Sequence, residues 1–302
     1  MEYYNDFWNN MRGNRDISNR INDGRETKTN AYYLPPTSSK KYMEALQRES
    51  VVRQLATVVN TTKGDNRICT SDCEGQANWG EGDAVDFLSG EDDFKRFEIQ
   101  AHRLSKLVRL GVEFASDHAF AIEDYVIKKI TRSFGKSEEI AFISGTGEGQ
   151  STGILHETKG AQIGVTTESA SAISYDEVIK LYFSLDKKYR KNGVWLMNDG
   201  TALALRTLKD ADGNYLWRDS DDTIFSKPVQ IVDSMPSIGN GQKAIAFGDF
   251  SQYWLVQRFP VTLRTLREKF IMSGQIGYLG CEYLDGKLIR QEAVKVLQMA
   301  KE

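Results

Sequence analysis

A glycine-rich run in the middle of the chain constrains the fold more than any other stretch. Residues 142–155 read FISGTGEGQSTGIL, with Gly145, Gly147, Gly149 and Gly153 between two short apolar segments. Glycine costs about 0.5–1 kcal/mol in regular structure, and it is favoured where the backbone takes a positive φ angle or passes close to another segment. We therefore interpret the run as a structural hinge loop between two packed regions.

Two chemical interpretations of this run fail on spacing. A phosphate-binding loop ends in Gly-Lys-Ser/Thr, and neither that ending nor the dinucleotide pattern GxGxxG is present. Residues 149–153 match the GxSxG pattern of serine hydrolases, in which an acid and then a histidine follow the serine along the chain. The only downstream histidine is His156, and no carboxylate lies between Ser151 and His156. A serine hydrolase using Ser151 is kept as a remote alternative, and no catalytic residue is assigned.

Composition excludes several other classes of protein. The chain has 302 residues with three cysteines and three histidines, which are too few and too scattered for a disulfide framework or a zinc site. We therefore expect no metal and no cofactor. No run approaches the roughly 18 apolar residues of a membrane-spanning helix, so we expect no membrane partner.

The net charge of −3 hides an uneven distribution of charge along the chain. Residues 61–93 hold nine acids and two bases, whereas residues 95–136 hold nine bases and five acids. An acidic stretch of this kind is usually only solvated. The alternative is that it lies across a basic surface of a neighbouring subunit.

The first hundred residues suggest parts that depend on a partner. Residues 1–30 balance five acids with five bases and show little apolar period, which predicts an arm that orders only against a partner. A helix is expected over 42–55, and strands over 56–59 and 97–101. The glycine-rich connection between the strands is long for a compact domain, and an isolated two-stranded ribbon is marginally stable in water. We therefore expect residues 61–94 to project onto an adjacent subunit.

A long helix is expected over residues 117–134, because apolar side chains recur every three or four residues and Gly135 follows as a terminator. Its opposite face carries Lys128, Lys129, Arg132 and Lys136, a possible DNA-facing basic face. Further along, helices are expected over 175–191 and 201–208, a buried strand over 194–197 and a long strand over 254–266. This alternation suggests a small α/β domain.

Motifs at five separated places resemble the tailed-bacteriophage major capsid protein family, which has the Hong Kong 97-type fold. The glycine run is similar to the family signature FxxGxGxxxPxGIL, with Ser151 where the family has proline. Further family-like segments lie at 79–81, 209–217, 225–236 and 244–253. The matches follow the family order and cover roughly residues 31–298.

The resemblance implies an α+β capsid fold in several parts. These are an N-terminal arm (1–30), a peripheral domain (31–59 and 95–160) with a spine helix (117–134), a two-stranded E-loop (61–94), an axial α/β domain (161–249), long strands returning to the peripheral domain (250–282) and a C-terminal segment (283–302).

The function implied by the resemblance is that of a major capsid protein, which assembles as pentamers and hexamers into an icosahedral shell around double-stranded DNA. Expected partners are copies of the chain itself, a separate scaffolding protein, a portal and decoration proteins. The expected location of the protein is the virion and, during assembly, the host cytoplasm. The inter-subunit arm residues would be Lys63, Asp72, Trp79, Glu81 and Asp83. An encapsulin-like bacterial compartment holding cargo enzymes is the alternative.

Overall fold

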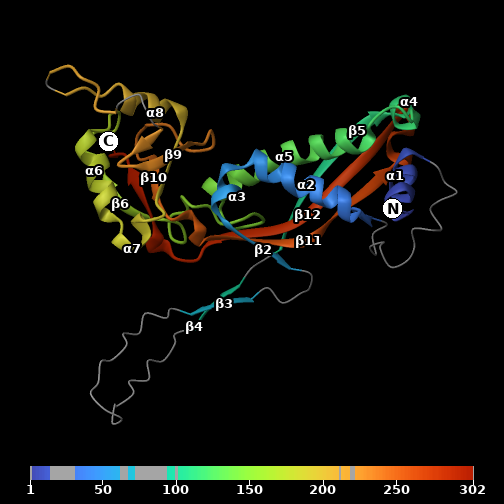
Figure 1. Cartoon of the computed structure of the whole chain (residues 1–302), viewed down its shortest axis with the longest axis horizontal. Coiled ribbons are helices and arrows are strands. Elements are labelled where there is room, and N and C mark those ends of the chain that lie inside the picture. Colours follow the sequence, from blue (N-terminus) through green and yellow to red (C-terminus); the bar gives the residue numbers. More distant parts are fainter. Residues whose placement is uncertain are drawn as a thin grey trace, which may run out of the picture.

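The computed structural model describes residues 2–13, 31–61, 67–71, 94–98, 101–210, 212–217 and 222–301. Figure 1 shows two lobes at opposite ends of an elongated molecule, with the N-terminus in one lobe and the C-terminus in the other. The helices are α1 (Glu2–Arg12), α2 (Pro36–Glu49), α3 (Val51–Leu55), α4 (Val112–Ser116), α5 (Ile122–Ser144), α6 (Tyr175–Ser184), α7 (Lys187–Arg190) and α8 (Asp199–Arg206), with short 3-10 turns η2 (Phe250–Gln252), η3 (Glu268–Ser273) and η4 (Gln291–Ala293).

The strands form two larger sheets and one separate pair. They are β1 (Tyr32–Tyr33), β2 (Thr57–Thr61), β3 (Arg67–Ser71), β4 (Phe94–Glu98), β5 (His102–Gly111), β6 (Gln162–Thr166), β7 (Val194–Met197), β8 (Thr223–Ile224), β9 (Lys227–Ile231), β10 (Lys243–Gly248), β11 (Tyr253–Leu266), β12 (Gln275–Leu288) and β13 (Val294–Gln298). The expected strand over 194–197 and the long strand over 254–266 are confirmed as β7 and β11.

The peripheral sheet is built around the antiparallel pair of β11 and β12. Its order is β1-β11-β12-β5, and β2 adds a parallel pairing to β11. Helices α2 and α5 pack against this sheet, and the shared core includes Leu46, Val126, Ile130, Leu263 and Tyr278. Strand β5 was not expected from the sequence. It is an edge strand with exposed polar residues on both sides, so it lacks a clear apolar alternation.

The spine helix is longer than the sequence suggested. Helix α5 begins at Ile122 and ends at Ser144, so the expected span of 117–134 is wrong at both ends. Gly135 does not end the helix. A Cβ atom at Gly135 would lie 2.5 Å from the Cβ atom of Glu49, which means that this glycine allows α2 to approach α5 closely. Packing along the whole helix outweighs the roughly 1 kcal/mol that an internal glycine costs.

The N-terminal residues are not an unsupported arm as far as they are described. Within α1, Phe7, Trp8 and Met11 are buried in the peripheral core. The Trp8 Nε1 atom donates a hydrogen bond to Ser38 Oγ at 3.0 Å, and the Tyr278 hydroxyl donates to the Met11 carbonyl oxygen at 3.0 Å. The expectation that residues 1–30 order only against a partner is therefore wrong for α1, and residues 14–30 lie outside the described ranges.

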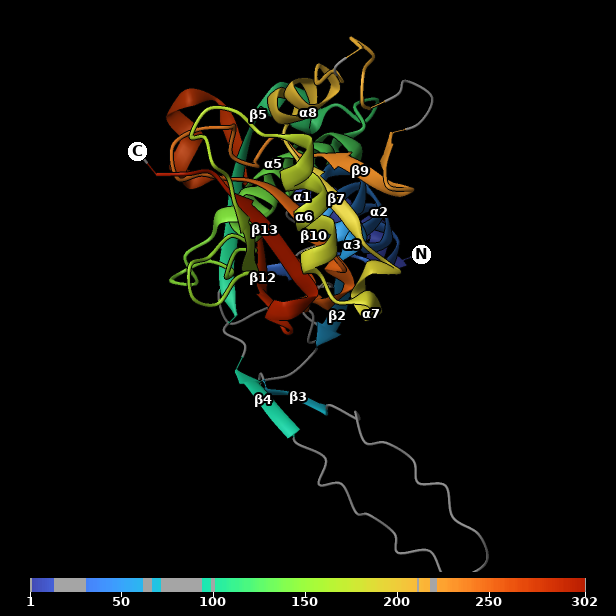
Figure 2. The same ribbon diagram turned by 90° about the vertical axis from the view of Figure 1, so that its left-hand side faces the viewer.

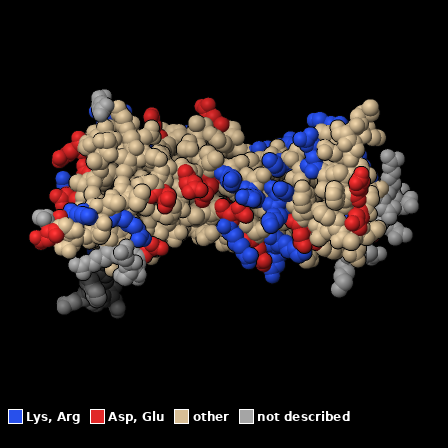
Figure 3. Space-filling model, turned by 90° about the horizontal axis from the view of Figure 1, so that it is seen from above, with Lys and Arg blue, Asp and Glu red and all other residues tan. Residues whose placement is uncertain are grey.

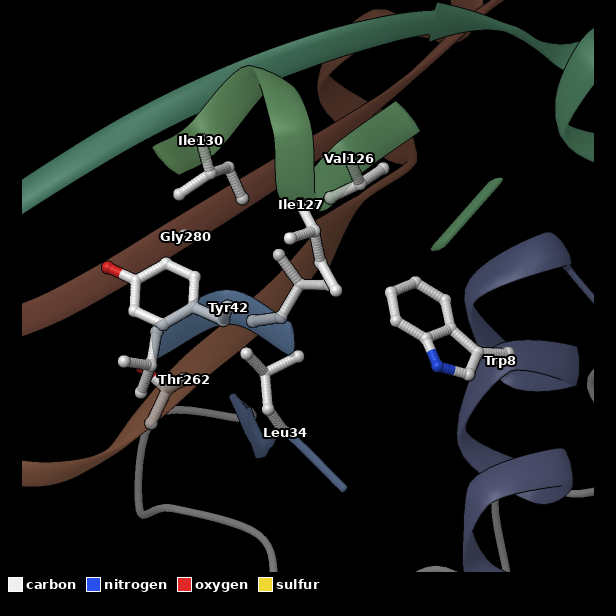
Figure 4. A pocket seen from close by; sticks show the side chains of 10 residues that line it. Trp8, Leu34, Tyr42, Val126, Ile127, Ile130, Thr262 and Gly280 are labelled. Atoms are coloured by element: carbon white, nitrogen blue, oxygen red, sulfur yellow. The ribbon is translucent and has the colours of Figure 1, made fainter. Parts of the chain in front are cut away.

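This core leaves almost no internal space. Figure 4 shows Trp8, Leu34, Val126 and Ile127 around a small apolar gap, with the hydroxyl of Tyr42 pointing away from Trp8. The gap has a volume of about 10 Å³. A cavity of that size holds at most one water molecule, and an apolar one stays dry. The gap is therefore a packing defect and not a ligand site.

The axial sheet has the order β6-β13-β10-β7-β9-β8. Side chains of α6 and α8 pack on one of its faces, where the rings of Trp195 and Phe247 stack with centroids 4.1 Å apart. The helix expected over 175–191 is split, because Leu185 has an extended backbone and Asp186 begins α7 as its N-cap. Likewise, the helix expected over 42–55 is two helices that meet at Ser50.

The end of the chain belongs to the axial sheet. Strand β12 runs through residue 283, where the sequence suggested a boundary, and continues to Leu288. Strand β13 then lies between β6, which it pairs with in parallel, and β10, which it pairs with in an antiparallel register. The last strand along the sequence is thus an inner strand of the sheet.

Candidate functional site

The glycine run forms a tight loop directly after the spine helix. Gly145 is the C-cap of α5, and Thr146 pairs with Thr152 across the loop. Gly147 and Gly149 have φ angles of +77° and +70°, which only glycine adopts readily. Gly153 has a different reason to be glycine, since a Cβ atom there would lie 2.4 Å from the Gly145 nitrogen.

The loop is fixed to the elements on both sides of it. The Thr152 nitrogen donates to the Gly286 oxygen on β12 at 2.9 Å, and the Tyr253 hydroxyl on β11 donates to the Thr152 oxygen at 2.8 Å. Its apolar ends belong to a core cluster that also contains residues of the axial sheet, such as Leu196 and Ala246. The loop therefore lies where the two lobes share a core. That it acts as a hinge stays a prediction.

The described residues do not place a histidine next to Ser151, as the serine hydrolase alternative would require. Ser151 is only 3% exposed, and none of its hydrogen bonds within the described ranges comes from a histidine. The Nδ1 atom of His156 accepts hydrogen bonds from the backbone nitrogens of Thr158 and Lys159, at 3.2 and 3.1 Å. The described residues also bring together no group of three or more His, Cys, Asp or Glu side chains that could hold a metal ion.

The basic face of α5 is exposed as expected. Lys128, Lys129, Arg132 and Lys136 all point to solvent, and none of the four forms an ion pair with another described residue. The Lys129 ammonium lies 5.7 Å from the ring centroid of Tyr125. We call these four residues the basic face. Their shared orientation follows from helical spacing, since residues three or four positions apart lie on one side of a helix.

Further bases surround the basic face. Figure 3 shows lysine and arginine side chains gathered over the part of the surface where α2, α5 and β5 lie. On β5, Arg103, Lys106 and Arg109 are exposed bases that the sequence patterns did not single out. Lys106 shares the face of β5 that packs toward α5, whereas Arg103 and Arg109 lie on the opposite face of the strand. The signal that could have found them is three bases in a seven-residue stretch without an acid. Acidic neighbours on α2 and α5 offset part of the charge, as in the contact of 3.9 Å between Lys40 and Glu44.

A two-stranded ribbon extends from the body of the molecule. Strands β3 and β4 pair in an antiparallel register from Arg67 opposite Glu98 to Ser71 opposite Phe94. Figures 1 and 2 show the ribbon pointing away from both lobes, and within the described part of the chain β3 packs extensively only on β4. The five expected inter-subunit residues, Lys63, Asp72, Trp79, Glu81 and Asp83, lie outside the described residues.

None of the helices found among the described residues combines the length and the apolar character that crossing a membrane requires.

Comparison with known proteins defines the class. A family model described as the phage capsid family matches residues 30–299. The chain therefore belongs to the phage capsid family. It is a major capsid protein with the Hong Kong 97-type fold that the sequence motifs implied. No curated protein sequence matches it.

Similar solved structures are capsids of GTA particles and of phages. The capsid of an empty GTA (gene-transfer agent) particle is 31% identical, with 83% of this chain and 90% of that chain covered and a TM-score of 0.67. The capsid of the native GTA particle is 28% identical, with 93% and 96% covered and a TM-score of 0.69. A protein of Gordonia phage Cozz, 13% identical over 84% and 87% of the chains with a TM-score of 0.60, shares the fold.

Proposed function

We propose that this chain builds a closed icosahedral shell of pentamers and hexamers around double-stranded DNA. The observation that carries the proposal is the β3–β4 ribbon, which points away from both lobes of its own chain. A two-stranded ribbon needs a surface to lie on, and a neighbouring copy supplies one. Repeating the same head-to-tail contact closes a ring. The related GTA capsids, whose structures were computed with C5 symmetry, support this arrangement.

The charges on the chain suggest a partner for the acidic residues 61–93 and another for the basic face of α5. The nine acids of residues 61–93 suit a basic surface of the next subunit. The basic face of α5 suits packaged DNA, which it would bind through phosphate charge without reading sequence. A capsid protein is located in the virion, and we propose assembly in the host cytoplasm with a separate scaffolding protein, a portal and decoration proteins.

Electron microscopy of the purified, concentrated full-length chain tests the shell. We expect closed particles of uniform diameter from the unaltered chain. A variant that lacks residues 64–92 is expected to stay folded by circular dichroism and to give only capsomers or monomers. Normal shells from that variant would show that the E-loop is not the inter-subunit arm. A monodisperse monomer from the unaltered chain, also in the presence of the proposed scaffolding protein, would contradict the shell itself.

A second experiment tests the DNA contact separately. We expect replacement of Lys128, Lys129, Arg132 and Lys136 by glutamine to leave shells intact and to lower the amount of DNA recovered per particle. The matched control replaces four exposed lysines of the axial lobe, the lobe that contains the axial sheet, by glutamine. These are Lys180, Lys187, Lys188 and Lys191. The control variant should package as much DNA as the unaltered chain does. Equal loss in both variants would mean that the basic face is not the DNA contact.

A further inference from the structure

Five polar side chains meet in the interior of the peripheral lobe, each from a different element. They are Tyr42 of α2, Arg53 of α3, Glu138 of α5, Gln257 of β11 and Glu282 of β12, and none is more than 3% exposed. We call these residues the buried network. It connects the spine helix to the long β11–β12 pair, and the proposed shell and DNA contacts do not use it.

Arg53 directs its hydrogen bonds to one of the two carboxyl groups. Its Nε and Nη2 atoms donate to the two oxygens of Glu138 at 2.9 and 2.7 Å, a two-point ion pair. Its Nη1 atom donates to the side-chain oxygen of Gln257 at 2.9 Å. The Glu138 carboxylate is therefore compensated by the guanidinium that faces it.

Glu282 has only neutral donors. Its Oε2 atom accepts hydrogen bonds from the Tyr42 hydroxyl at 2.7 Å and from Gln257 Nε2 at 3.2 Å. Its Oε1 atom accepts none from the described residues, yet the carboxyl group of Glu138 lies within hydrogen-bonding reach of Glu282. Two carboxyl groups in such contact attract each other only when one of them carries a proton.

Charge counting leads to the same result. One guanidinium and two ionised carboxylates would leave a net negative charge in a site without solvent, which is strongly unfavourable. Burial and the charge of Glu138 both raise the pKa of Glu282 well above its usual range. Burial also raises the pKa of Tyr42 and that of Tyr253 on β11. The charges of Asp285 and Glu138 raise the pKa of Tyr253 further, so both hydroxyls stay neutral.

We propose that Glu138 and Glu282 hold one proton between them, on Glu282, and that this buried proton site is a pH-dependent connection between α5 and the β11–β12 pair. A proton on Oε1 donates to Glu138 and satisfies the one atom of the network that otherwise lacks a partner. Removal of the proton leaves two facing negative charges, and Arg53 forms its ion pair with Glu138 alone. The repulsion between the two carboxylates then weakens the contact between the spine helix and the sheet.

The direction of the pH effect follows from linkage. The pKa of Glu282 is higher in the folded chain than the value of about 4.3 for an unfolded glutamate. Its contribution to stability is therefore complete below about pH 4.3 and is lost as the pH rises through the folded-state pKa. Between the two pKa values, the ratio of folded to unfolded chain falls about tenfold per pH unit through this group alone.

Hydrogen exchange of the α5 backbone amides in the full-length chain tests the proposal, with each variant compared at equal pH to cancel intrinsic rates. Glu282→Gln keeps the shape and supplies a permanent N–H donor to Glu138. We expect the protection of α5 in the unaltered chain, relative to Glu282→Gln, to fall by up to tenfold per pH unit as the pH rises from about 4.3 to the folded-state pKa of Glu282. Parallel pH dependence in both would overturn the proposal. The exposed Glu44→Gln of α2 should follow the unaltered chain, and a divergence there would also overturn it.

Infrared spectroscopy keeps the proposal falsifiable if Glu282→Gln does not fold. The unaltered chain should show the carbonyl band of a protonated carboxylic acid at neutral pH, and the band should disappear on alkaline titration. Absence of that band at neutral pH would overturn the proposal. Neither measurement depends on shell closure, so its failure is distinguishable from failure of the proposed function.

Discussion

Replacement of Gly153 by alanine tests the reasoning about the glycine loop most directly. The added Cβ atom would lie 2.4 Å from the Gly145 nitrogen, 2.6 Å from the Ile143 oxygen and 2.8 Å from the Ile143 carbonyl carbon. Non-bonded carbon atoms rest at about 3.5–4.0 Å, so the two segments must separate by about 1 Å. All three neighbouring atoms are backbone atoms, so no side chain can rotate away.

That separation breaks the ladder which joins the loop to the end of α5. The nitrogens of residues 153, 154 and 155 donate to the carbonyl oxygens of residues 145, 142 and 143, at 2.9, 2.7 and 2.8 Å. Each such bond contributes about 1 kcal/mol, and overpacking adds about 1–3 kcal/mol. Reduced freedom of the unfolded chain returns about 0.4–1 kcal/mol. We therefore expect Gly153→Ala to lower the free energy of unfolding by about 3–5 kcal/mol.

The matched control is Gly149→Ala in the same loop. Gly149 has a φ angle of +70°, but its added Cβ atom would meet no atom within 4 Å. The expected cost is only the left-handed backbone, about 1–2 kcal/mol. Urea unfolding at one fixed protein concentration measures both variants, because assembly adds to apparent stability. A cost for Gly153→Ala no larger than that for Gly149→Ala would refute the close-approach argument.

Two further predictions concern α1 and a strained turn. Phe7→Ala should lower the free energy of unfolding by about 3–5 kcal/mol, because Phe7 is fully buried. As a control, replacement of the exposed Asn5 by alanine should change it by no more than about 0.5 kcal/mol. Similar urea midpoints for both variants would contradict the placement of α1. Ser226 has a φ angle of +59°, which glycine adopts more readily than serine. Ser226→Gly should therefore raise the free energy of unfolding by about 0.5–1 kcal/mol and raise the melting temperature, whereas Ser226→Ala should not. Equal melting temperatures of the two variants would show that the backbone at Ser226 is not strained.

The sequence predicted best where a feature depends on neighbouring residues. The buried strand over 194–197 and the long strand ending at Leu266 are local patterns, and both are confirmed. The glycine run predicted a loop with unusual backbone geometry, because its four glycines lie close together in sequence. The basic face follows from helical spacing alone, although its contact with DNA stays a prediction.

The misses have physical reasons. In α1 the apolar residues Tyr3, Tyr4, Phe7, Trp8 and Met11 have helical spacing, but the signal disappears when composition is averaged over residues 1–30. A glycine such as Gly135 often marks the end of a helix. Here it allows the close approach of Glu49, which is far away in sequence.

Long-range pairing explains why the buried network could not be predicted. Arg53 and Glu138 are 85 residues apart, and Arg53 and Gln257 are 204 residues apart. A charged residue in an amphipathic segment ordinarily indicates solvent, because unpaired charges are rarely buried. Only the fold shows that these residues compensate one another.

The position of β13 affects the timing of folding during translation. Ribosomes synthesise β13 after every other strand of its sheet, yet it lies between β6 and β10. Within the described residues, β6 has β13 as its only partner strand, so the nascent axial lobe cannot close its sheet while the final segment is still being made. A chain whose synthesis has not yet reached β13 therefore leaves the facing edges of β6 and β10 unpaired, and such edges can pair with a neighbouring chain.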